Sequence, residues 1–182
     1  MSTETLPDLY ALVAYIKSDL GEFVENLRAE LHPKHAHLPA HISILPPRPL
    51  LGTEERALGC LRALCSQVVP FEVEIGDVET FVPTTPTVFL RIGHRGYRLR
   101  ELHDQLNCNQ LAFTEPLLYM PHVTIAKLDG MDRAHEVFEI SQARWAAYTG
   151  ARKARIEELT FVRGRDHTWI DLDTVRLTGV PK

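Results

Sequence analysis

Alternating apolar and polar positions divide the chain into strands and helices that follow one another in mixed order. An apolar run at residues 9–16 is typical of a buried strand. Further strands are predicted over residues 41–45, 71–81, 87–92, 119–128, 156–163 and 168–177. Helical periodicity predicts a helix that begins near Ser18 and Asp19 and stops at Pro33, and others over roughly 53–68, 96–107 and 132–149. This order favours an α+β fold with a largely antiparallel sheet.

Two turns are predicted from their residue types. Pro46 and Pro47 are expected to close the strand over 41–45, and the turn Gly164-Arg-Asp166 is expected to join the last two strands. No GxGxxG sequence or Walker loop is present, so the chain does not have the pattern of a doubly wound dinucleotide binder.

Two of the predicted strands carry nearly the same sequence. The first reads Pro-Ala-His41-Ile-Ser43-Ile-Leu and the second reads Met-Pro-His122-Val-Thr124-Ile-Ala. Alternate side chains of a strand share a face, so His41 and Ser43 are expected to project together, as are His122 and Thr124. One His-x-Ser/Thr tripeptide is uninformative, but two copies in the same apolar context, nearly half the chain apart, indicate two related halves of the protein.

The composition is that of an ordinary globular protein and excludes several classes. The chain has 182 residues, and its net charge of -4 argues against a protein that coats long nucleic acid through a basic face. Three cysteines without a CxxC pair, Cys60, Cys65 and Cys108, give no disulfide framework and no cysteine-based zinc site. No apolar run approaches the ~20 residues of a membrane span, and no basic, apolar leader opens the chain. We therefore expect a cytoplasmic protein without a membrane partner; the oligomeric state is not readable.

The two histidine motifs resemble those of the 2H phosphoesterase superfamily, which includes the bacterial 2'-5' RNA ligase and cyclic phosphodiesterase proteins. That family is defined by two His-x-Ser/Thr motifs in hydrophobic strands, matched here by His41-Ile-Ser43 and His122-Val-Thr124. The resemblance covers the whole chain and implies a single bilobal domain over residues 1–182. It implies two lobes of mostly antiparallel sheet related by a pseudo-twofold axis, with outer helices and the motif strands side by side in a central cleft.

The same resemblance implies a metal-independent phosphodiesterase without a cofactor. Its expected substrate is a cyclic phosphate at a nucleotide or RNA 3'-end, with a 2'-phosphate as the product. His41 and His122 are the expected acid and base, because an ordinary imidazole pKa of about 6.5 allows either protonation state near neutrality. Ser43 and Thr124 are expected to bind the phosphoryl oxygens. Lys127 follows the second motif, where many members carry a basic residue, often arginine, and is expected to contribute to substrate binding.

Some residues near the motifs have a structural interpretation beside a functional one. Tyr119 is expected to pack in the core, and Phe113 and Trp169 are expected to be core residues, with base stacking as the functional alternative. Four arginines are expected to form a solvated face, with phosphate contacts as the alternative. These are Arg91, Arg95, Arg98 and Arg100.

Three alternatives remain open at the level of the sequence. The first is a zinc site, because four histidines lie close together, although Pro33 and Pro39 disrupt regular ligand spacing. These histidines are His32, His35, His37 and His41. The second is 2'-5' RNA ligase activity, and the third is a non-catalytic module that binds nucleotides or RNA ends. Intact histidines in both motifs favour catalysis over binding alone.

Overall fold

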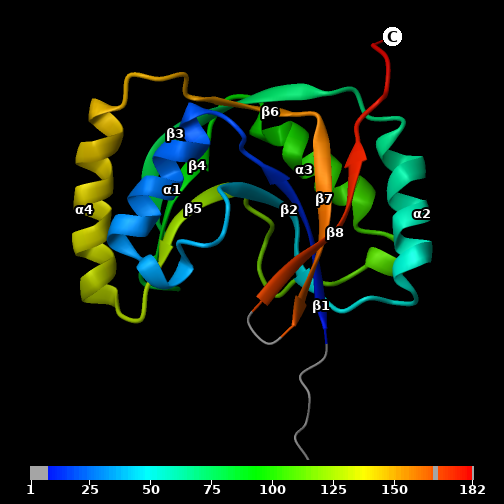
Figure 1. Cartoon of the computed structure of the whole chain (residues 1–182), viewed down its shortest axis with the longest axis horizontal. Helices are drawn as coiled ribbons and strands as arrows, with labels where there is room; N and C mark the ends of the chain where they lie inside the picture. Colours follow the sequence, from blue (N-terminus) through cyan, green and yellow to red (C-terminus); the bar gives the residue numbers. More distant parts are fainter. Residues whose placement is uncertain (1–7, 166–167, 182) are drawn as a thin grey trace, which may run out of the picture.

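The computed structural model describes residues 8–165 and 168–181, in which strands and helices alternate in the expected mixed order (Figure 1). The strands are β1 (Leu9–Tyr15), β2 (His41–Arg48), β3 (Phe71–Thr80), β4 (Thr87–Ile92), β5 (His122–Lys127), β6 (Lys153–Ile156), β7 (Glu158–Arg165) and β8 (Thr168–Arg176). The α-helices are α1 (Asp19–Leu31), α2 (Glu54–Cys65), α3 (Gly96–Leu106) and α4 (Met131–Ala147). Two short 3-10 turns are η1 (Pro33–His35) and η2 (Asn109–Leu111).

All strands belong to one antiparallel sheet in the order β6-β3-β4-β5-β2-β1-β7-β8. The sheet divides naturally between β2 and β5, which share a single residue pair, Ile42 with Val123. We call β2-β1-β7-β8 the first half-sheet and β5-β4-β3-β6 the second. The seam between them is the junction of β2 and β5. The expectation of an α+β fold with an antiparallel sheet is confirmed.

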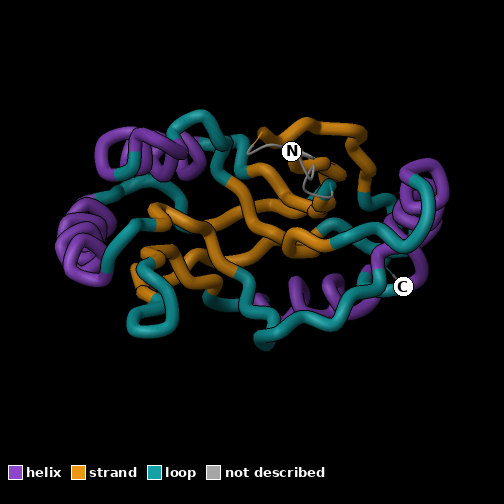
Figure 2. The backbone as a smooth tube through the Cα atoms, turned by 90° about the horizontal axis from the view of Figure 1, so that it is seen from below, coloured by secondary structure: helices purple, strands orange, loops and turns teal. Residues whose placement is uncertain are grey.

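The helices lie outside the strands, and two of them are exchanged between the half-sheets (Figures 1 and 2). Helix α1 follows β1 of the first half-sheet but packs on β5 of the second, whereas α3 follows β4 of the second but packs on β2 of the first. Helices α2 and α4 pack on β8 and β3, within the half-sheet nearest to them in sequence. This arrangement gives the two halves matching layouts, and each depends on a helix from the other.

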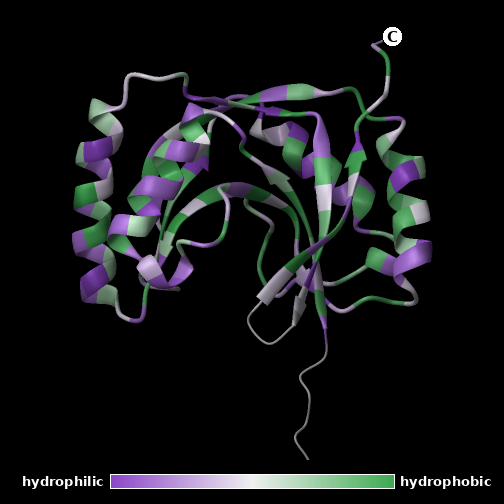
Figure 3. Cartoon of the chain, viewed as in Figure 1, coloured by the Kyte–Doolittle hydropathy of each residue, from purple (hydrophilic) through white to green (hydrophobic). Residues whose placement is uncertain are grey.

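The two faces of the motif strands have different environments. Ile42, Ile44, Val123 and Ile125 are each 0% exposed and belong to the main core between the sheet and the helices. Hydrophobic and hydrophilic residues alternate along each helix in Figure 3, as a helix with one apolar face requires. On the opposite face of the first half-sheet, a small cluster of alanine and valine side chains packs with Tyr15 and Trp169.

The structure differs from the expected elements at β2 of the first half-sheet. The strand β2 does not end at the prolines but runs through Pro46 and Pro47 to Arg48, whose partner in the register is Tyr10 of β1. Register shifts in β1 near Leu12 let this paired stretch continue beside the prolines, which lack an N–H for the ladder. The prediction that β2 stops at Leu45 was therefore wrong.

Three more differences concern β6, β5 and β7. The strand β6 was missed: residues 153–156 pair with β3, while β7 begins two residues later and pairs with β1. Strand β5 begins at His122 rather than Tyr119. Gly164 and Arg165, which were predicted to lie in the turn, belong to β7, and Asp166 lies outside the described residues.

None of the helices in residues 8–165 and 168–181 has the length and apolar content to cross a membrane.

Candidate active site

The two motif strands lie side by side at the seam. The pair formed by Ile42 and Val123 joins them, and both side chains are 0% exposed because they point into the core under the helices. The residues on either side of this pair therefore project to the opposite face of the sheet. The sequence prediction that both motifs present their polar side chains on one face is consistent with this register.

Continuing the register by one residue sets each histidine across from the hydroxyl residue of the other motif. His41 then faces Thr124, and Ser43 faces His122. Facing residues of antiparallel strands have Cβ atoms about 5 Å apart, and diagonal neighbours are about 7–8 Å apart. In a regular ladder the four polar side chains would therefore lie together, with the imidazoles on one diagonal and the hydroxyls on the other.

Both imidazoles make the same hydrogen bond to their own backbone. His41 Nδ1 lies 2.8 Å from the carbonyl oxygen of Pro39, and His122 Nδ1 lies 2.8 Å from that of Met120. A carbonyl oxygen only accepts, so each Nδ1 carries the proton and donates it. The neutral form of both rings therefore has its lone pair on Nε2, at the far edge of the ring. Two residues from distant parts of the chain thus have the same tautomer for the same reason.

Burial lowers the pKa of both histidines from the ordinary value, because it disfavours the charged imidazolium. For His41, the positive charges of Arg28 and His122 lower the pKa further. The bonds to the two backbone carbonyls act in the opposite direction and raise it.

Aromatic rings fix the orientation of each imidazole. Phe81 and Phe89 pack edge-on against His122, with ring centroids 5.1 and 5.2 Å away. Tyr15 makes a similar edge contact with His41 at 6.4 Å. These contacts, together with the Nδ1 bonds, leave little freedom for either ring to rotate.

The first motif lines a narrow hollow of about 110 Å³. Its walls include His41 and Ser43 from β2, Tyr15 from β1 and Trp169 from β8. The indole lies close over β7, where a Cβ added at Gly164 would meet three ring carbons at 3.2–3.3 Å. Glycine at this position therefore lets the ring lie flat beside the motif.

The second motif lines a wider hollow of about 620 Å³, which shares Pro47 with the first. His122, Thr124 and Lys127 line it from β5, and Phe113 lines it from the loop after η2. A hollow of this size lies within the range of small-molecule sites, roughly 300–1,000 Å³. His41 therefore lines the smaller hollow and His122 the larger one.

A bulge in β5 explains how Lys127 reaches the wider hollow. Strict alternation from His122 and Thr124 would put Lys127 on the opposite face. The register with β4 shifts by one residue between Thr124 and Ala126, which is the signature of an extra residue in one strand. Lys127 thereby lies on the side of His122 and Thr124, in keeping with the substrate-binding role expected for it.

The comparison with protein families identifies the chain's relatives. A family model described as the 2'-5' RNA ligase superfamily matches residues 16–168. The chain belongs to this superfamily. The resemblance to the 2H phosphoesterases seen in the sequence is thereby confirmed.

Several curated relatives of this superfamily member carry the name "Putative phosphoesterase". One from Halalkalibacterium halodurans is 27% identical over 122 residues, which is 65% of this chain and 69% of the relative. Another, from Oceanobacillus iheyensis, is 21% identical and covers 86% of this chain and 99% of the relative. These names support a phosphoesterase in the broad sense.

Solved structures show the same fold. The crystal structure of Escherichia coli LigT complexed with ATP is similar with a TM-score of 0.59 and 17% identity, covering 95% of this chain and 99% of LigT. The structure of a Thermus thermophilus protein is similar with a TM-score of 0.58 and 15% identity, and the match covers 96% of this chain and 99% of the Thermus chain. The paired half-sheets of this superfamily member are therefore a shared architecture.

Four of the residues that had two interpretations have informative positions. Trp169 lines the hollow of His41 and Phe113 lines that of His122, so neither is simply a core residue. Tyr119 is half-buried before β5 begins and donates its hydroxyl to the carbonyl oxygen of Ser43 at 2.8 Å, so the prediction of simple core packing was wrong. Arg91 pairs with His122 in the register, but its guanidinium contacts Glu79 at 3.2 Å.

The His-rich loop of this superfamily member does not have the geometry of a zinc site. The rings of His32 and His35 stack with centroids 4.5 Å apart, and His37 stacks on His35 at 6.3 Å. Within the part of the chain that the structure describes, no three His, Cys, Asp or Glu side chains gather closely enough to hold a metal ion. The zinc hypothesis thus lacks support from these residues.

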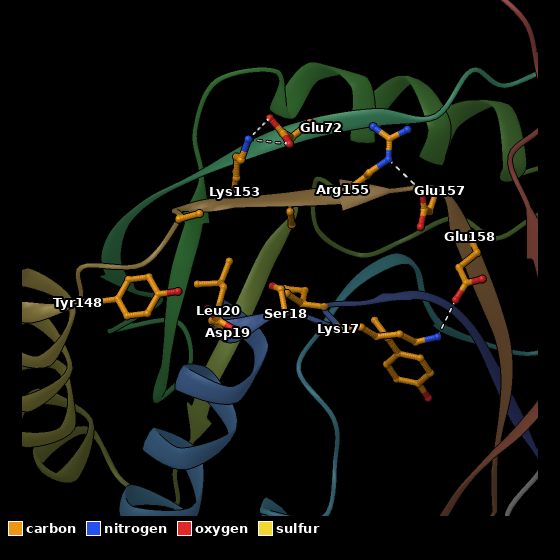
Figure 4. Close-up of a pocket in the computed structure, with 14 residues that line it drawn as sticks. Lys17, Ser18, Asp19, Leu20, Glu72, Tyr148, Lys153, Arg155, Glu157 and Glu158 are labelled. Atoms are coloured by element: carbon orange, nitrogen blue, oxygen red, sulfur yellow. Dashed lines mark hydrogen bonds and ion pairs between the residues drawn. The ribbon is translucent and has the colours of Figure 1, made fainter.

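A further pocket of about 360 Å³ shares Tyr15 with the first hollow, but none of the four motif residues lines it (Figure 4). Three basic side chains line it, and each is paired with a carboxylate. The pairs are Lys17–Glu158 at 2.6 Å, Lys153–Glu72 at 3.2 Å and Arg155–Glu157 at 2.9 Å. Because their charges are already matched, these cations are poorly suited to a phosphate, which favours the motif face as the anion site.

Proposed function

We propose that this protein opens a cyclic phosphate at a nucleotide or RNA 3'-end, converting a 2',3'-cyclic phosphate into a 2'-phosphate. In this proposal His41 and His122 supply acid/base catalysis, and neither a metal nor a cofactor takes part. The observation that carries the proposal is the matched pair of Nδ1 bonds, which leaves the Nε2 atom of each ring as its proton-transfer atom.

The reaction balances with these two groups. Water attacks phosphorus, and one neutral Nε2 takes the water proton while the new P–O bond forms. The bond from phosphorus to the ribose O3' breaks, and the other imidazole, protonated beforehand, donates its Nε2 proton to that oxygen. Because each ring has the same tautomer, either can begin as base while the other begins as acid.

The remaining residues of the site are proposed to hold the phosphate. Ser43 and Thr124 donate their hydroxyl groups to the non-bridging oxygens, whose negative charge increases as water adds. Lys127 contributes positive charge from the edge of the wider hollow. A cyclic phosphate carries one negative charge, and its approach favours the imidazolium form that burial otherwise disfavours.

Two observations support a nucleotide as the substrate class. Solved structures of LigT are complexed with ATP, 3'-AMP and NADP+, so a protein of the same fold takes nucleotides. In this chain the wider hollow has Phe113 in its wall, and an aromatic ring suits the flat face of a base. The nucleoside is therefore proposed to occupy the side of His122.

The test is hydrolysis of the four nucleoside 2',3'-cyclic phosphates in the presence of EDTA, followed by phosphorus NMR to distinguish 2'- from 3'-phosphate. His41→Asn and His122→Asn are each expected to lower kcat by about 100- to 10,000-fold, the range of a lost acid or base. His135→Asn, an exposed position on α4, is the matched control and should keep the full rate.

Each outcome has a distinct meaning. Full activity in both motif variants would show that the histidine pair is not the catalyst. Tight nucleotide binding without turnover by the unaltered protein would favour a binding module. Joining of RNA ends with a 2'-5' bond would favour the ligase.

A further inference from the structure

Each half of the protein buries one basic side chain at the same place on its exchanged helix. The buried positions of α1 and α3 follow the same spacing, so that Val24, Leu27 and Leu31 correspond to Leu99, Leu102 and Leu106. Between the second and third of these positions, α1 has Arg28 and α3 has His103, which are 3% and 5% exposed. Basic groups on an otherwise apolar helix face are costly to bury unless they are hydrogen-bonded.

Arg28 donates its hydrogen bonds to backbone carbonyl oxygens around the two motifs. Its Nη2 donates to the carbonyl oxygen of Thr124 at 2.6 Å, and its Nε donates to that of Ile125 at 3.3 Å. Its Nη1 donates to the carbonyl oxygen of Leu38, just before the first motif strand. One guanidinium therefore ties the second motif to the segment that leads into the first.

The other exchanged helix reaches the first motif through a tyrosine. The Tyr119 hydroxyl donates to the carbonyl oxygen of Ser43 at 2.8 Å. The Tyr119 ring stacks on His103, with centroids 4.1 Å apart and planes within 7°. His103 Nε2 in turn lies 3.1 Å from both carboxylate oxygens of Glu115. The stack and the carboxylate together hold the tyrosine beneath the motif.

The two arrangements end on equivalent atoms. Arg28 binds the carbonyl of Thr124, and Tyr119 binds the carbonyl of Ser43, so each holds the peptide group of the hydroxyl residue in one motif. The seam has only one residue pair, so a regular ladder does not fix the strands beyond it. Side-chain donors supply the missing constraint at the two positions where the hydroxyls must be placed.

We propose that Arg28 and Tyr119 are positioning residues that hold the Thr124 and Ser43 hydroxyls at the spacing that binds the phosphate. This proposal rests on the proposed function, because it assigns the hydroxyls to the phosphoryl oxygens. Neither residue needs to contact the reacting atoms. A shift of about 1 Å in such a group costs roughly 100-fold in rate, so small changes in these donors have large effects on turnover.

The first variant is Tyr119→Phe, which removes the hydroxyl and keeps the ring on His103. It is expected to lower kcat by roughly 10- to 100-fold with KM within about threefold, because the backbone of Ser43 loses its donor. Tyr97→Phe, on the exposed side of α3, is the matched control. A rise in KM with kcat unchanged would make Tyr119 a substrate contact in the wider hollow and overturn the positioning role.

The second variant is Arg28→Lys, which keeps the charge but cannot bind the two neighbouring carbonyls with a planar fork. It is expected to lower kcat as Tyr119→Phe does, while the limb of the pH profile that reports His41 stays in place. In Arg28→Gln that limb should move to higher pH, because the charge that lowers the pKa of His41 is gone. Arg144→Lys, an exposed arginine on α4, is the control.

Crystal structures of Tyr119→Phe and Arg28→Lys keep the test independent of activity. The separation of the Ser43 and Thr124 oxygens should change in the variants and remain the same in the controls. If the unaltered protein does not open cyclic phosphates, the proposed function fails, and this separation then decides the positioning role alone. The positioning role would be overturned if both folded variants kept an unchanged kcat or an unchanged distance between the Ser43 and Thr124 hydroxyl oxygens. A fall in their melting temperatures would not alter that conclusion.

Discussion

The buried ion pair between Arg48 and Glu115 provides a sharp test of the energetics of the fold. The side chain of Arg48 is 0% exposed and that of Glu115 is 13% exposed, and the Arg48 Nη2 donates to the Glu115 carboxylate. Arg48 also donates to Asn107 Oδ1 at 2.7 Å and to the carbonyl oxygen of Leu111 at 3.1 Å. Glu115→Ala would remove the charged partner and leave the guanidinium buried with neutral acceptors only.

The expected loss in the free energy of unfolding is about 3–5 kcal/mol, the cost of breaking a buried pair from one side. Glu115→Gln keeps an acceptor of similar shape and should lose less. The control is Glu30→Ala, which breaks a surface pair with Arg144 whose side chains are 49% and 53% exposed. Exposed pairs contribute roughly 0.2–1 kcal/mol, so this control should change stability little.

Urea unfolding followed by circular dichroism measures all three variants, and an unchanged slope shows that the transition itself is the same. If the losses in the free energy of unfolding of Glu115→Ala and Glu30→Ala differ by less than about 1 kcal/mol, the Arg48–Glu115 pair does not have the energetics of a buried ion pair. Such a result would also weaken the case that Glu115 stabilises His103 beneath Tyr119.

Two other predictions concern the site itself. Because burial lowers the pKa of His41 and His122, the kcat/KM profile of the free enzyme should be bell-shaped, with both limbs below the ordinary imidazole value of about 6.5. The alkaline limb marks the loss of the proton from the imidazole that acts as acid. The unfolded chain takes up these protons first, so stability should also decline as pH falls from about 6.5, and a limb above that value in the pH–rate profile would contradict the lowered pKa values. Lys127→Ala should raise KM about fivefold and make KM less dependent on salt concentration. The control is Lys153→Ala, in the pocket of Figure 4, which should leave KM unchanged. Equal effects of the two substitutions would show that Lys127 acts only through the net charge of the protein.

The sequence predicted the parts of the site that repeat along the chain. The two His-x-Ser/Thr strands, their shared face and the apolar residues between them follow from period-two alternation, which local sequence encodes directly. The same pattern predicted most of the elements and the antiparallel α+β class. It missed β6, because residues 153–156 run into the next strand with one residue between them.

The sequence could not predict contacts that depend on how distant elements pack. Arg28 stands out as an arginine on the apolar face of a helix, and this signal was available in the spacing of its neighbours. Its partners are backbone carbonyls of β5, which no side-chain pattern reveals. The position of Lys127 likewise depends on a bulge, and the hydrogen bond of Tyr119 depends on β5 starting three residues later than alternation predicted.

The exchange of α1 and α3 has a consequence for how such a protein selects what it binds. Neither repeat could be excised as an independent unit, because each would lose the helix that covers its own motif strand and expose the apolar face beneath. For the same reason the halves cannot hinge apart without pulling a helix off a core. A molecule entering this site therefore meets walls whose separation was set during folding, and discrimination by size is built into the chain's connectivity.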